Sequence, residues 1–585
     1  MFANVRERSG SGRLNRGGLV NDFNKLWLPP TMGRRRFILG TGAVAFLAAC
    51  GGDDDAASPS TPPAGTTADT AAPANTSSAT ASTAPTPGTT APATTAPAGG
   101  AKMGGTLRVG VVGSTNDLMD GQYIVARADQ ARLISGWEPI ANYDDDFNIA
   151  YNNSLAEEIE VLAPDEYVIR LKDGIEFHNG KTVGADDLIY SFNRLIDPEL
   201  GIAPNLATFV DADSFTKMDE RTVGIKLLTP SVAFQYSLAD YGATIVPVDY
   251  ARFDGDPSTQ IGTSAFKLES FTPGSESVHT RFENYWGDSY LDEVQIIDFA
   301  DQSALVNALT SGDIDVALDV PFAQAGAIES SGDLELLEAA AGNWQTITMR
   351  IDMAPFDDVR VRQAMRLIVD RPQMVERVLS GHGRVGNDMY GVLDASYPED
   401  FPQREQDIEQ AKALLADAGQ ENLEIELFAP DDTAGLPEFA TAFAEQAKEA
   451  GINVTATVLD GGTYWGDEYT QRVFATSYWS TRPYLNQVGA GSLPTATYQE
   501  TKWPPADSDF ISLYEQALGE VDDDKRNEII RQMQQEEYDG GGNIIAYFQN
   551  LIDGHASYVK GAVSRPNLIN FDHMGRGWKN IWLDV

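Results

Sequence analysis

The sequence predicts an α/β fold with two lobes, because two strand–helix–strand patterns lie far apart in the chain. The first covers residues 294–318, where an apolar strand is followed by a helix ending at Gly312 and by a second strand. The second covers residues 423–459, with a helix closed by Gly451 between its strands. This order at this length implies parallel strands joined by right-handed crossovers. A β-branched run at residues 106–112 is typical of a further strand, buried on both faces of a sheet.

Length and composition describe a large, acidic, globular chain. Its 585 residues, 42% of them hydrophobic, are enough for roughly two to four domains with sizeable cores. A formal net charge of −44 opposes contact with nucleic acid or an anionic membrane surface through long-range repulsion. Cys50 is the only cysteine in the sequence, so we expect no disulfide bond, and stability must come from the cores.

Residues 1–50 predict a lipoprotein export signal. Arginines at 34–36 precede an apolar run over 37–49, which is too short to span a bilayer. The arginines with Phe37 are similar to a twin-arginine signal, and LAAC, which ends at Cys50, is similar to the lipobox of bacterial lipoproteins. Cys50 is therefore the predicted lipidation site, where two acyl chains would anchor the protein. Whether Met1 or Met32 begins the chain is left open.

Residues 51–102 predict a disordered tether. They are almost wholly Ala, Thr, Pro, Ser, Gly and Asp, and so have little apolar surface to bury. As a flexible coil they would span about 40 Å, which allows a folded module to stand away from a membrane.

The most informative stretch, residues 162–192, predicts a strand and an amphipathic helix. Tyr167, Ile169 and Leu171 alternate with polar residues and form the buried face of the strand. Ile175 and Phe177 are expected to resume the strand before a tight turn at Asn179-Gly180. The helix begins with acidic residues in its first turn, where they face the positive end of its dipole. Its apolar stripe consists of Leu188, Ile189, Phe192, Leu195 and Ile196.

Two motifs carry a resemblance to a known family. The segment LKDGIEFHNGKTVGADDLIYS at 171–191, and PFDDVRVRQA at 355–364, resemble motifs of the family 5 extracellular solute-binding proteins, the peptide-, nickel- and opine-binding class that serves ABC importers. The resemblance implies a two-lobed periplasmic-binding-protein-like fold with an extra inserted domain, hence three structural segments. It divides the chain into lobe I at 103–142, 261–350 and 543–585, an inserted domain at 143–260, and lobe II at 351–542.

The resemblance also implies ligand-lining residues in lobe I. The segment NDLMDGQYIVARADQARLISGWEPI is similar to the family's extended stretch that lines the ligand. By that similarity the lining residues are Tyr123, Ile124, Val125 and Ala126. An ordinary strand-to-helix connection would have the same composition.

Trp479 and Arg482 follow the predicted strand 473–479 and mark the expected ligand side of lobe II. Open α/β sheets bind ligands beyond the carboxyl ends of their strands. Peptide-binding members of the family often carry an aspartate three residues after this tryptophan, whereas this chain has Arg482. Because a guanidinium suits carboxylate or phosphate, we expect a ligand with an anionic group rather than a peptide held by its amine. The alternative is that Arg482 pairs with an acid of the protein itself.

Several aromatic residues could supply ring faces to the ligand, or could instead be core. Trp344 and Trp465 are the further candidates for ligand contact, with Tyr478 and Tyr484 beside Trp479 in sequence. The three arginines at 360, 362 and 366 also suggest a basic patch, but we expect them to be solvated or paired with nearby acids.

Nothing in the sequence indicates catalysis, a metal or a cofactor. The five histidines lie far apart without metal-ligand spacing, and the mature chain lacks nucleophile-elbow, P-loop and dinucleotide motifs. Asp144-Asp145-Asp146 lacks the glycine and distal glutamate of a calcium loop.

We therefore expect a monomeric, lipid-anchored, extracytoplasmic receptor that closes on a small solute and delivers it to an ABC permease. The alternatives are a lipid-anchored cell-envelope hydrolase, disfavoured by the lack of a nucleophile and base at useful spacing, and a sensor or folding helper with the same cleft.

Overall fold

The computed structural model describes residues 100–565 and 577–585, apart from residues 125, 145–147, 201, 204, 205, 241, 432, 467 and 497. Residues Ala98–Val585 form one compact unit. The predicted export signal, Cys50, nearly all of the predicted tether and Val125 lie outside the described residues. No helix among the described residues is long and apolar enough to cross a membrane.

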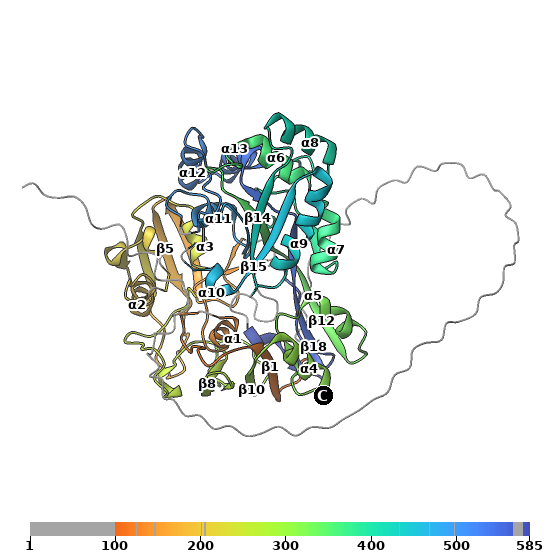
Figure 1. The fold of residues 1–585 in the computed structure, drawn as a ribbon. Coiled ribbons are helices and arrows are strands. Elements are labelled where there is room, and N and C mark those ends of the chain that lie inside the picture. The colour runs from red at the N-terminus through yellow and green to blue at the C-terminus, as the bar shows by residue number, and fades with distance from the viewer. Residues whose placement is uncertain are drawn as a thin grey trace, which may run out of the picture. The chain divides into compact units, whose positions relative to one another are not determined.

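A single twelve-stranded sheet runs through the compact unit (Figure 1). Its strand order is β15-β14-β16-β12-β18-β11-β1-β10-β9-β8, with β13 paired to β18 and β17 paired to β12. The strands are β1 (Thr106–Val112), β8 (Phe266–Thr272), β9 (Glu276–Arg281), β10 (Glu293–Phe299), β11 (Val316–Ala317), β12 (Leu334–Met349), β13 (Gly383–Val385), β14 (Glu424–Pro430), β15 (Asn453–Leu459), β16 (Phe474–Trp479), β17 (Asn543–Ile544) and β18 (Tyr547–Ala556).

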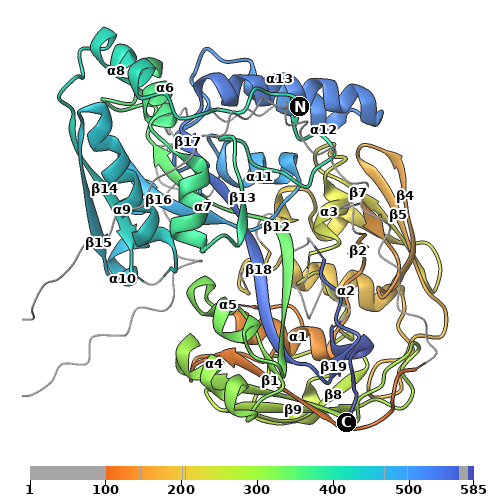
Figure 2. The same cartoon turned by 90° about the vertical axis from the view of Figure 1, so that its right-hand side faces the viewer.

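Two long antiparallel strands, β12 and β18, join the two parts of this sheet, as Figure 2 shows. The register between them shifts between Ala339 and Asn343, which marks an irregularity near the middle of β12. On one side β18 pairs with β11, and on the other β12 pairs with β16. Both predicted parallel units therefore belong to one sheet.

The first predicted parallel unit is confirmed and lies within the proposed lobe I. Strand β1 lies between β10 and β11 and is parallel to both. Helix α4 (Gln302–Ser311) connects β10 to β11, and it ends at Gly312 with a φ of 81°, a conformation that suits glycine. The helices α1 (Arg127–Gly136) and α5 (Phe322–Glu329) also belong to this half of the sheet.

The second predicted parallel unit is also confirmed and lies within the proposed lobe II. Strands β14 and β15 are parallel, with α9 (Leu436–Ala447) between them in the chain. Strand β16 pairs parallel to β14 and antiparallel to β12. The PFDDVRVRQA segment starts α6 (Val359–Leu367), which is capped by Asp358. The helices α7 (Arg371–Leu379) and α8 (Ile408–Asp417) follow it.

A separate antiparallel sheet, in the order β4-β5-β7-β6, lies within the proposed inserted domain. Its strands are β4 (Ala156–Ala163), β5 (Glu166–Leu171), β6 (Phe215–Lys217) and β7 (Thr222–Lys226), and α2 (Ala185–Leu195) packs with them. Tyr167, Ile169 and Leu171 are buried as predicted. Ile175 and Phe177 are buried too, but the expected strand there is wrong, because only an isolated bridge between Glu176 and Thr182 forms.

The remaining elements are four short strands and five helices. They are β2 (Asn142–Tyr143), β3 (Ile149–Ala150), β19 (Val559–Lys560), β20 (Trp582–Leu583), α3 (Phe234–Ser237), α10 (Gly461–Tyr464), α11 (Tyr484–Gly491), α12 (Phe510–Gly519) and α13 (Asp523–Gly540).

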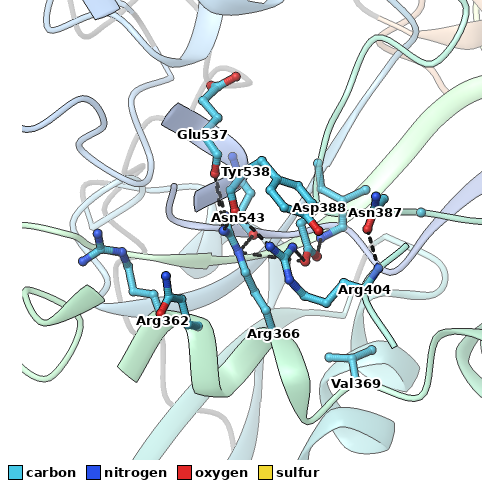
Figure 3. A network of polar contacts seen from close by, with 12 residues as sticks. Arg362, Arg366, Val369, Asn387, Asp388, Arg404, Glu537, Tyr538 and Asn543 are labelled. Atoms are coloured by element: carbon cyan, nitrogen blue, oxygen red, sulfur yellow. Dashed lines mark hydrogen bonds and ion pairs between the residues drawn. The ribbon is translucent and has the colours of Figure 1, made fainter. Parts of the chain in front are cut away.

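The expected pairing of the α6 arginines with nearby acids is confirmed for Arg360 and Arg366. Arg360 does pair with Asp358 at the surface. Arg366, however, is buried and donates to the backbone carbonyls of Tyr538 and Asn543, both at 2.9 Å (Figure 3). Burial lowers the pKa of Arg366 to about 9.

A neighbouring buried carboxylate completes this network. Asp388 accepts from Arg371 at 2.6 Å and from Arg404, and it lies 4.0 Å from Arg366. Arg362 is buried as well and donates to the carbonyl of Gly540 at 2.8 Å. The network thus ties α6 to the end of α13 and has a structural role.

Candidate functional site

Strand β16 ends at Trp479, and Arg482 follows it within three residues, just before α11. The Arg482 guanidinium lies over the Trp479 ring, with its central carbon 5.4 Å from the ring centroid. One terminal nitrogen is 3.5 Å from the side-chain oxygen of Gln487, at the long limit of a hydrogen bond. Among the described residues, no carboxylate oxygen lies within the 4.0 Å ion-pair distance of this half-buried guanidinium. In this conformation Arg482 therefore keeps donors for an anionic group.

Trp479 is the end of a stack of four aromatic rings. Trp344 lies 5.9 Å from Trp479, Tyr390 lies 5.5 Å from Trp344, and Tyr484 lies 5.3 Å from Tyr390, with interplanar angles of 14°, 13° and 18°. Trp344 is only 2% exposed and Trp479 only 7%. In this conformation Trp344 is a core residue between two rings, and ligand contact by Trp344 stays a prediction.

Trp465 belongs to a second, more exposed aromatic group at the end of β16. Its ring meets those of Tyr464, Tyr469 and Tyr478 edge to face, at 4.7, 5.1 and 5.7 Å. Tyr478 is 51% exposed, whereas Trp465 is half-buried. This group borders Trp479 through Tyr498, whose ring lies 5.8 Å from the Trp479 ring.

The predicted lobe I residues form the approach to α1. Tyr123 is half-buried, and the Arg252 guanidinium lies 4.6 Å from its ring centroid. Ile124 packs against the lobe I core, and Ala126 precedes α1 with its N–H donated to Asp129 at 3.1 Å. Their contact with a ligand stays a prediction.

Asp240 is a residue that sequence reasoning missed. Its carboxylate accepts the N–H of Gly242 at 3.0 Å, and a side chain on Gly242 would come within 3.2 Å of the Gln122 carbonyl oxygen. Asp240 is therefore held beside the Gln122-Tyr123 segment. An aspartate two residues before a glycine is an Asx-turn signal, but that signal does not report what lies across from the turn.

The side chain of Asp240 is exposed. Desolvation raises the pKa of its carboxyl, while the Gly242 N–H and the positive charge of Arg482 act in the opposite direction. The same two charges act on Tyr143, where desolvation raises the pKa, Asp240 adds to that rise and Arg482 opposes it.

Glu500 is a second residue that sequence reasoning missed, and it contacts Trp479. Its carboxylate accepts from Tyr469 at 2.7 Å, from Ser477, and from the Trp479 indole N–H at 3.3 Å. Burial raises the pKa of Glu500. It borders two small cavities, one of which is also lined by Trp344, Trp479 and Gln487. Glu500 fixes the orientation of Trp479 from the protein side.

The described residues contain no group of three or more His, Cys, Asp or Glu side chains arranged to hold a metal ion. His279 is buried and His178 is half-buried, and desolvation lowers the pKa of His178 to about 4 and that of His279 to about 3. The site thus offers charges and ring faces for binding.

Residues 150–496 match the family model for bacterial extracellular solute-binding proteins, family 5, middle region. Among curated proteins, the heme-binding protein A of Haemophilus influenzae is 28% identical over 280 residues, which cover 44% of this chain and 51% of that protein. The glutathione-binding protein GsiB of Pectobacterium atrosepticum is 23% identical over 415 residues, covering 68% of this chain and 78% of that protein. The chain thus spans about half of the first relative and most of the second.

Solved structures share the fold over the described unit. AgaA of A. tumefaciens in complex with agropinic acid has a TM-score of 0.68 at 23% identity, covering 82% of this chain and 99% of AgaA. The oligopeptide-binding protein AppA of Bacillus subtilis, in complex with a nonapeptide, has a TM-score of 0.67 at 21% identity, covering 83% and 100%. With the family match over more than half of the sequence, the chain belongs to the bacterial extracellular solute-binding proteins of family 5, which capture solutes for ABC importers, and it is a binding protein and not an enzyme.

Proposed function

We propose that this protein captures a small solute carrying an anionic group, closes its lobes on it and delivers it to an ABC importer. The observation that carries the proposal is Arg482, whose guanidinium stacks on Trp479 at the end of β16 and has no ion pair within 4.0 Å among the described residues. A planar guanidinium binds carboxylate and phosphate through paired hydrogen bonds. Named relatives and neighbours bind heme, glutathione, agropinic acid or a nonapeptide, so family membership alone does not select the solute.

Closure is proposed to occur about β12 and β18, the strands that pass between the two cores. A ligand shifts such a balance only by binding the closed form more tightly than the open form. Moving the population from mostly open to mostly closed takes about 5.5 kcal/mol of differential binding. Arg482 and the lobe I residues Tyr123, Ile124, Val125 and Ala126 would contribute to it from opposite sides.

We also propose that the mature protein is a monomer anchored through a lipid on Cys50, with residues 51–102 as its tether. The supporting observation is the arginine-led apolar run that ends in LAAC. The domain division stays as proposed from the sequence, with the inserted domain at 143–260 between parts of lobe I. Detergent phase partitioning tests the anchor: the wild type should enter the detergent phase and Cys50→Ala should remain in the aqueous phase.

A thermal-shift panel of opines, short peptides, oligosaccharides, metal chelates and other organic anions tests the solute class. A ligand at a hundredfold excess over its Kd adds about 2.7 kcal/mol to the free energy of unfolding. Calorimetry on the best anionic ligand then compares wild type with Arg482→Ala, for which we expect about a 10-fold or greater loss of affinity. Arg377→Ala is the matched control, since Arg377 is an exposed lobe II arginine paired with Glu445. Unchanged affinity in Arg482→Ala would refute the role of Arg482.

A further inference from the structure

The short helix α3 is anchored within the proposed inserted domain. Phe234 is fully buried in the core of that domain, and its ring meets the Tyr167 ring of β5 at 5.2 Å. The Tyr167 hydroxyl donates to the Ser231 carbonyl at 2.7 Å, just before the helix. The Tyr143 ring stacks on the Tyr236 ring at 6.2 Å, and its hydroxyl donates to the Tyr236 carbonyl at 3.0 Å. These contacts make α3 part of the inserted domain.

The start of α3 also contacts the proposed lobe II. In both views α3 lies between β5 and α11 (Figures 1 and 2). The Val232 N–H donates to the carbonyl of Leu518, at the end of α12, at 2.9 Å. Ala233, which is only 3% exposed, is buried in the aromatic cluster that contains Trp479. Ala233 and Phe234 are neighbours in sequence and thus belong to two different apolar clusters.

The proposed lobe II contributes side chains to the same contact. Leu393, in the loop between β13 and α8, packs against the core of the inserted domain. Tyr236 packs against both that core and the aromatic cluster around Trp479. The contact is therefore largely apolar, with side chains from both parts. Such a contact stabilises the conformation in which the two parts touch, because it removes apolar surface from water.

Motion about β12 and β18 would break this contact. The chain enters and leaves the proposed inserted domain from lobe I, near residues 143 and 260, so no covalent connection holds that domain against lobe II. Val232 and Ala233 lie on one part, whereas Leu518 and Trp479 lie on the other. Opening would expose Ala233 to water and leave the Val232 N–H without the Leu518 carbonyl. The contact therefore belongs to the closed conformation.

We propose that the start of α3 is a latch between the inserted domain and lobe II, which keeps part of the ligand-free protein closed. The latch consists of Val232, Ala233 and Tyr236 on one side and of Leu393 and Leu518 on the other. This inference rests on the proposed closure about β12 and β18, and it does not depend on which solute is bound. The latch lowers the free energy of the closed form without touching the solute. The solute must then supply less differential binding than a mostly open receptor would require.

Distances between spin labels in the ligand-free, full-length protein test the latch. Cys50 is the only cysteine in the sequence, so a Cys50→Ser chain accepts labels at chosen cysteines. Asp213→Cys in the inserted domain and Glu528→Cys on α13 are exposed positions that report the separation of the two parts. Pulsed electron–electron double resonance should show the short distance of the described conformation in about a tenth of the molecules or more, beside a longer distance. Glu376→Cys with Glu528→Cys, both in lobe II, provides the reference distance that should not change.

Substitutions on both sides of the latch should open the protein. Ala233→Glu should lower the ratio of closed to open molecules about 10-fold or more, because closure would then bury a carboxylate among apolar side chains. Leu393→Ala, on the lobe II side, should lower the ratio about 3-fold or more. Ala251→Glu is the matched control, since it adds the same charge at an exposed position of the inserted domain and should leave the ratio unchanged.

Three results would overturn the inference. The first is a ligand-free wild type that shows the longer distance alone. The second is a short-distance population that Ala233→Glu and Leu393→Ala both retain in full, and the third is an equal loss of that population in Ala251→Glu. Melting curves verify folding of each variant, and Leu393→Ala decides alone if Ala233→Glu does not fold. The proposed solute capture is judged separately by the thermal-shift panel, so each proposal can fail without the other.

Discussion

His178 and Gly262 bind each other through two hydrogen bonds. The His178 N–H donates to the Gly262 carbonyl at 2.8 Å, and the Gly262 N–H donates to His178 Nδ1 at 3.2 Å. The other ring nitrogen, Nε2, donates to the Ser264 carbonyl at 2.9 Å, which fixes the tautomer. The histidine of the FHNG motif therefore joins the proposed inserted domain to the segment that returns to lobe I.

His178→Phe should be strongly destabilising. Phenylalanine retains the edge contact with the Phe282 ring, now 5.1 Å away, but leaves the Gly262 N–H and the Ser264 carbonyl without partners. Each unpaired buried group costs about 1–3 kcal/mol, so we expect a loss of about 2 kcal/mol or more in urea unfolding at pH 8. A loss below 0.5 kcal/mol, on the order of a surface change, would contradict this role.

The pH dependence of His178 has a definite sign. Desolvation lowers its pKa from 6.5 to about 4, so the unfolded chain binds a proton more readily than the folded chain. Its contribution to stability is complete above about pH 6.5 and is lost as the pH falls toward 4. The free energy of unfolding that His178→Phe loses relative to wild type should therefore become smaller as the pH falls from about 6.5 to 4. Urea unfolding at each pH measures this difference.

Gly262→Ala should destabilise the same junction for a steric reason. A Cβ at this position would lie 1.9 Å from the Gly136 carbonyl oxygen, and a backbone atom has little freedom to move. We expect a loss of about 2 kcal/mol or more. The control is Gly326→Ala in α5, where nothing lies within 4 Å and alanine should add about 0.5–1 kcal/mol. Equal effects of the two changes on the melting temperature would refute the steric explanation.

Local patterns predicted much of the fold because each lies within a short stretch. The run at 106–112 is β1, and both strand–helix–strand units have their predicted parallel pairing. Local patterns could not predict that the two units share one sheet. The reason is that β12 pairs with β16, β17 and β18, which follow it by more than a hundred residues. The burial of Arg366 was missed because its hydrogen bonds to Tyr538 and Asn543 go to backbone carbonyls, which leave no charge pattern in the sequence.

The position of Trp479 and Arg482 after a strand was predictable from the sequence, and their contact with a ligand stays a prediction. The rule for strand ends located Trp479 and Arg482, which the structure stacks together. The sequence could not decide whether Trp344 lies in the core or on a binding surface, since tryptophan occurs in both places.

Glu537 should make stability fall as the pH rises through the neutral range. It accepts from Tyr390 at 2.6 Å and Tyr484 at 2.7 Å, and burial raises its pKa from 4.5 to about 7. The folded state then binds a proton that the unfolded state has released, so the contribution of the protonated form is lost between about pH 4.5 and 7. The loss is about 3 kcal/mol at most.

Glu537→Gln removes this titration and should flatten the wild-type slope over that window in urea unfolding. Glu528→Gln is the control, since Glu528 is exposed on the same helix and should leave the slope unchanged. An unaltered slope in Glu537→Gln would show that Glu537 ionises normally.

Substitutions at Trp344 and Tyr478 should distinguish a core residue from a residue of the binding surface. Trp344 is 2% exposed within the ring stack, so Trp344→Ala should cost about 3–5 kcal/mol through lost burial and a cavity. Tyr478 is 51% exposed beside Trp465, so Tyr478→Ala should change stability by less than about 0.5 kcal/mol. If Tyr478 lines the closed site, Tyr478→Ala should nevertheless weaken ligand affinity in calorimetry.

Trp344→Phe keeps a ring in the stack and serves as the matched change. A loss of affinity in Trp344→Phe at unchanged stability would instead place Trp344 on the ligand surface, because only a contact made with the solute would respond in that way.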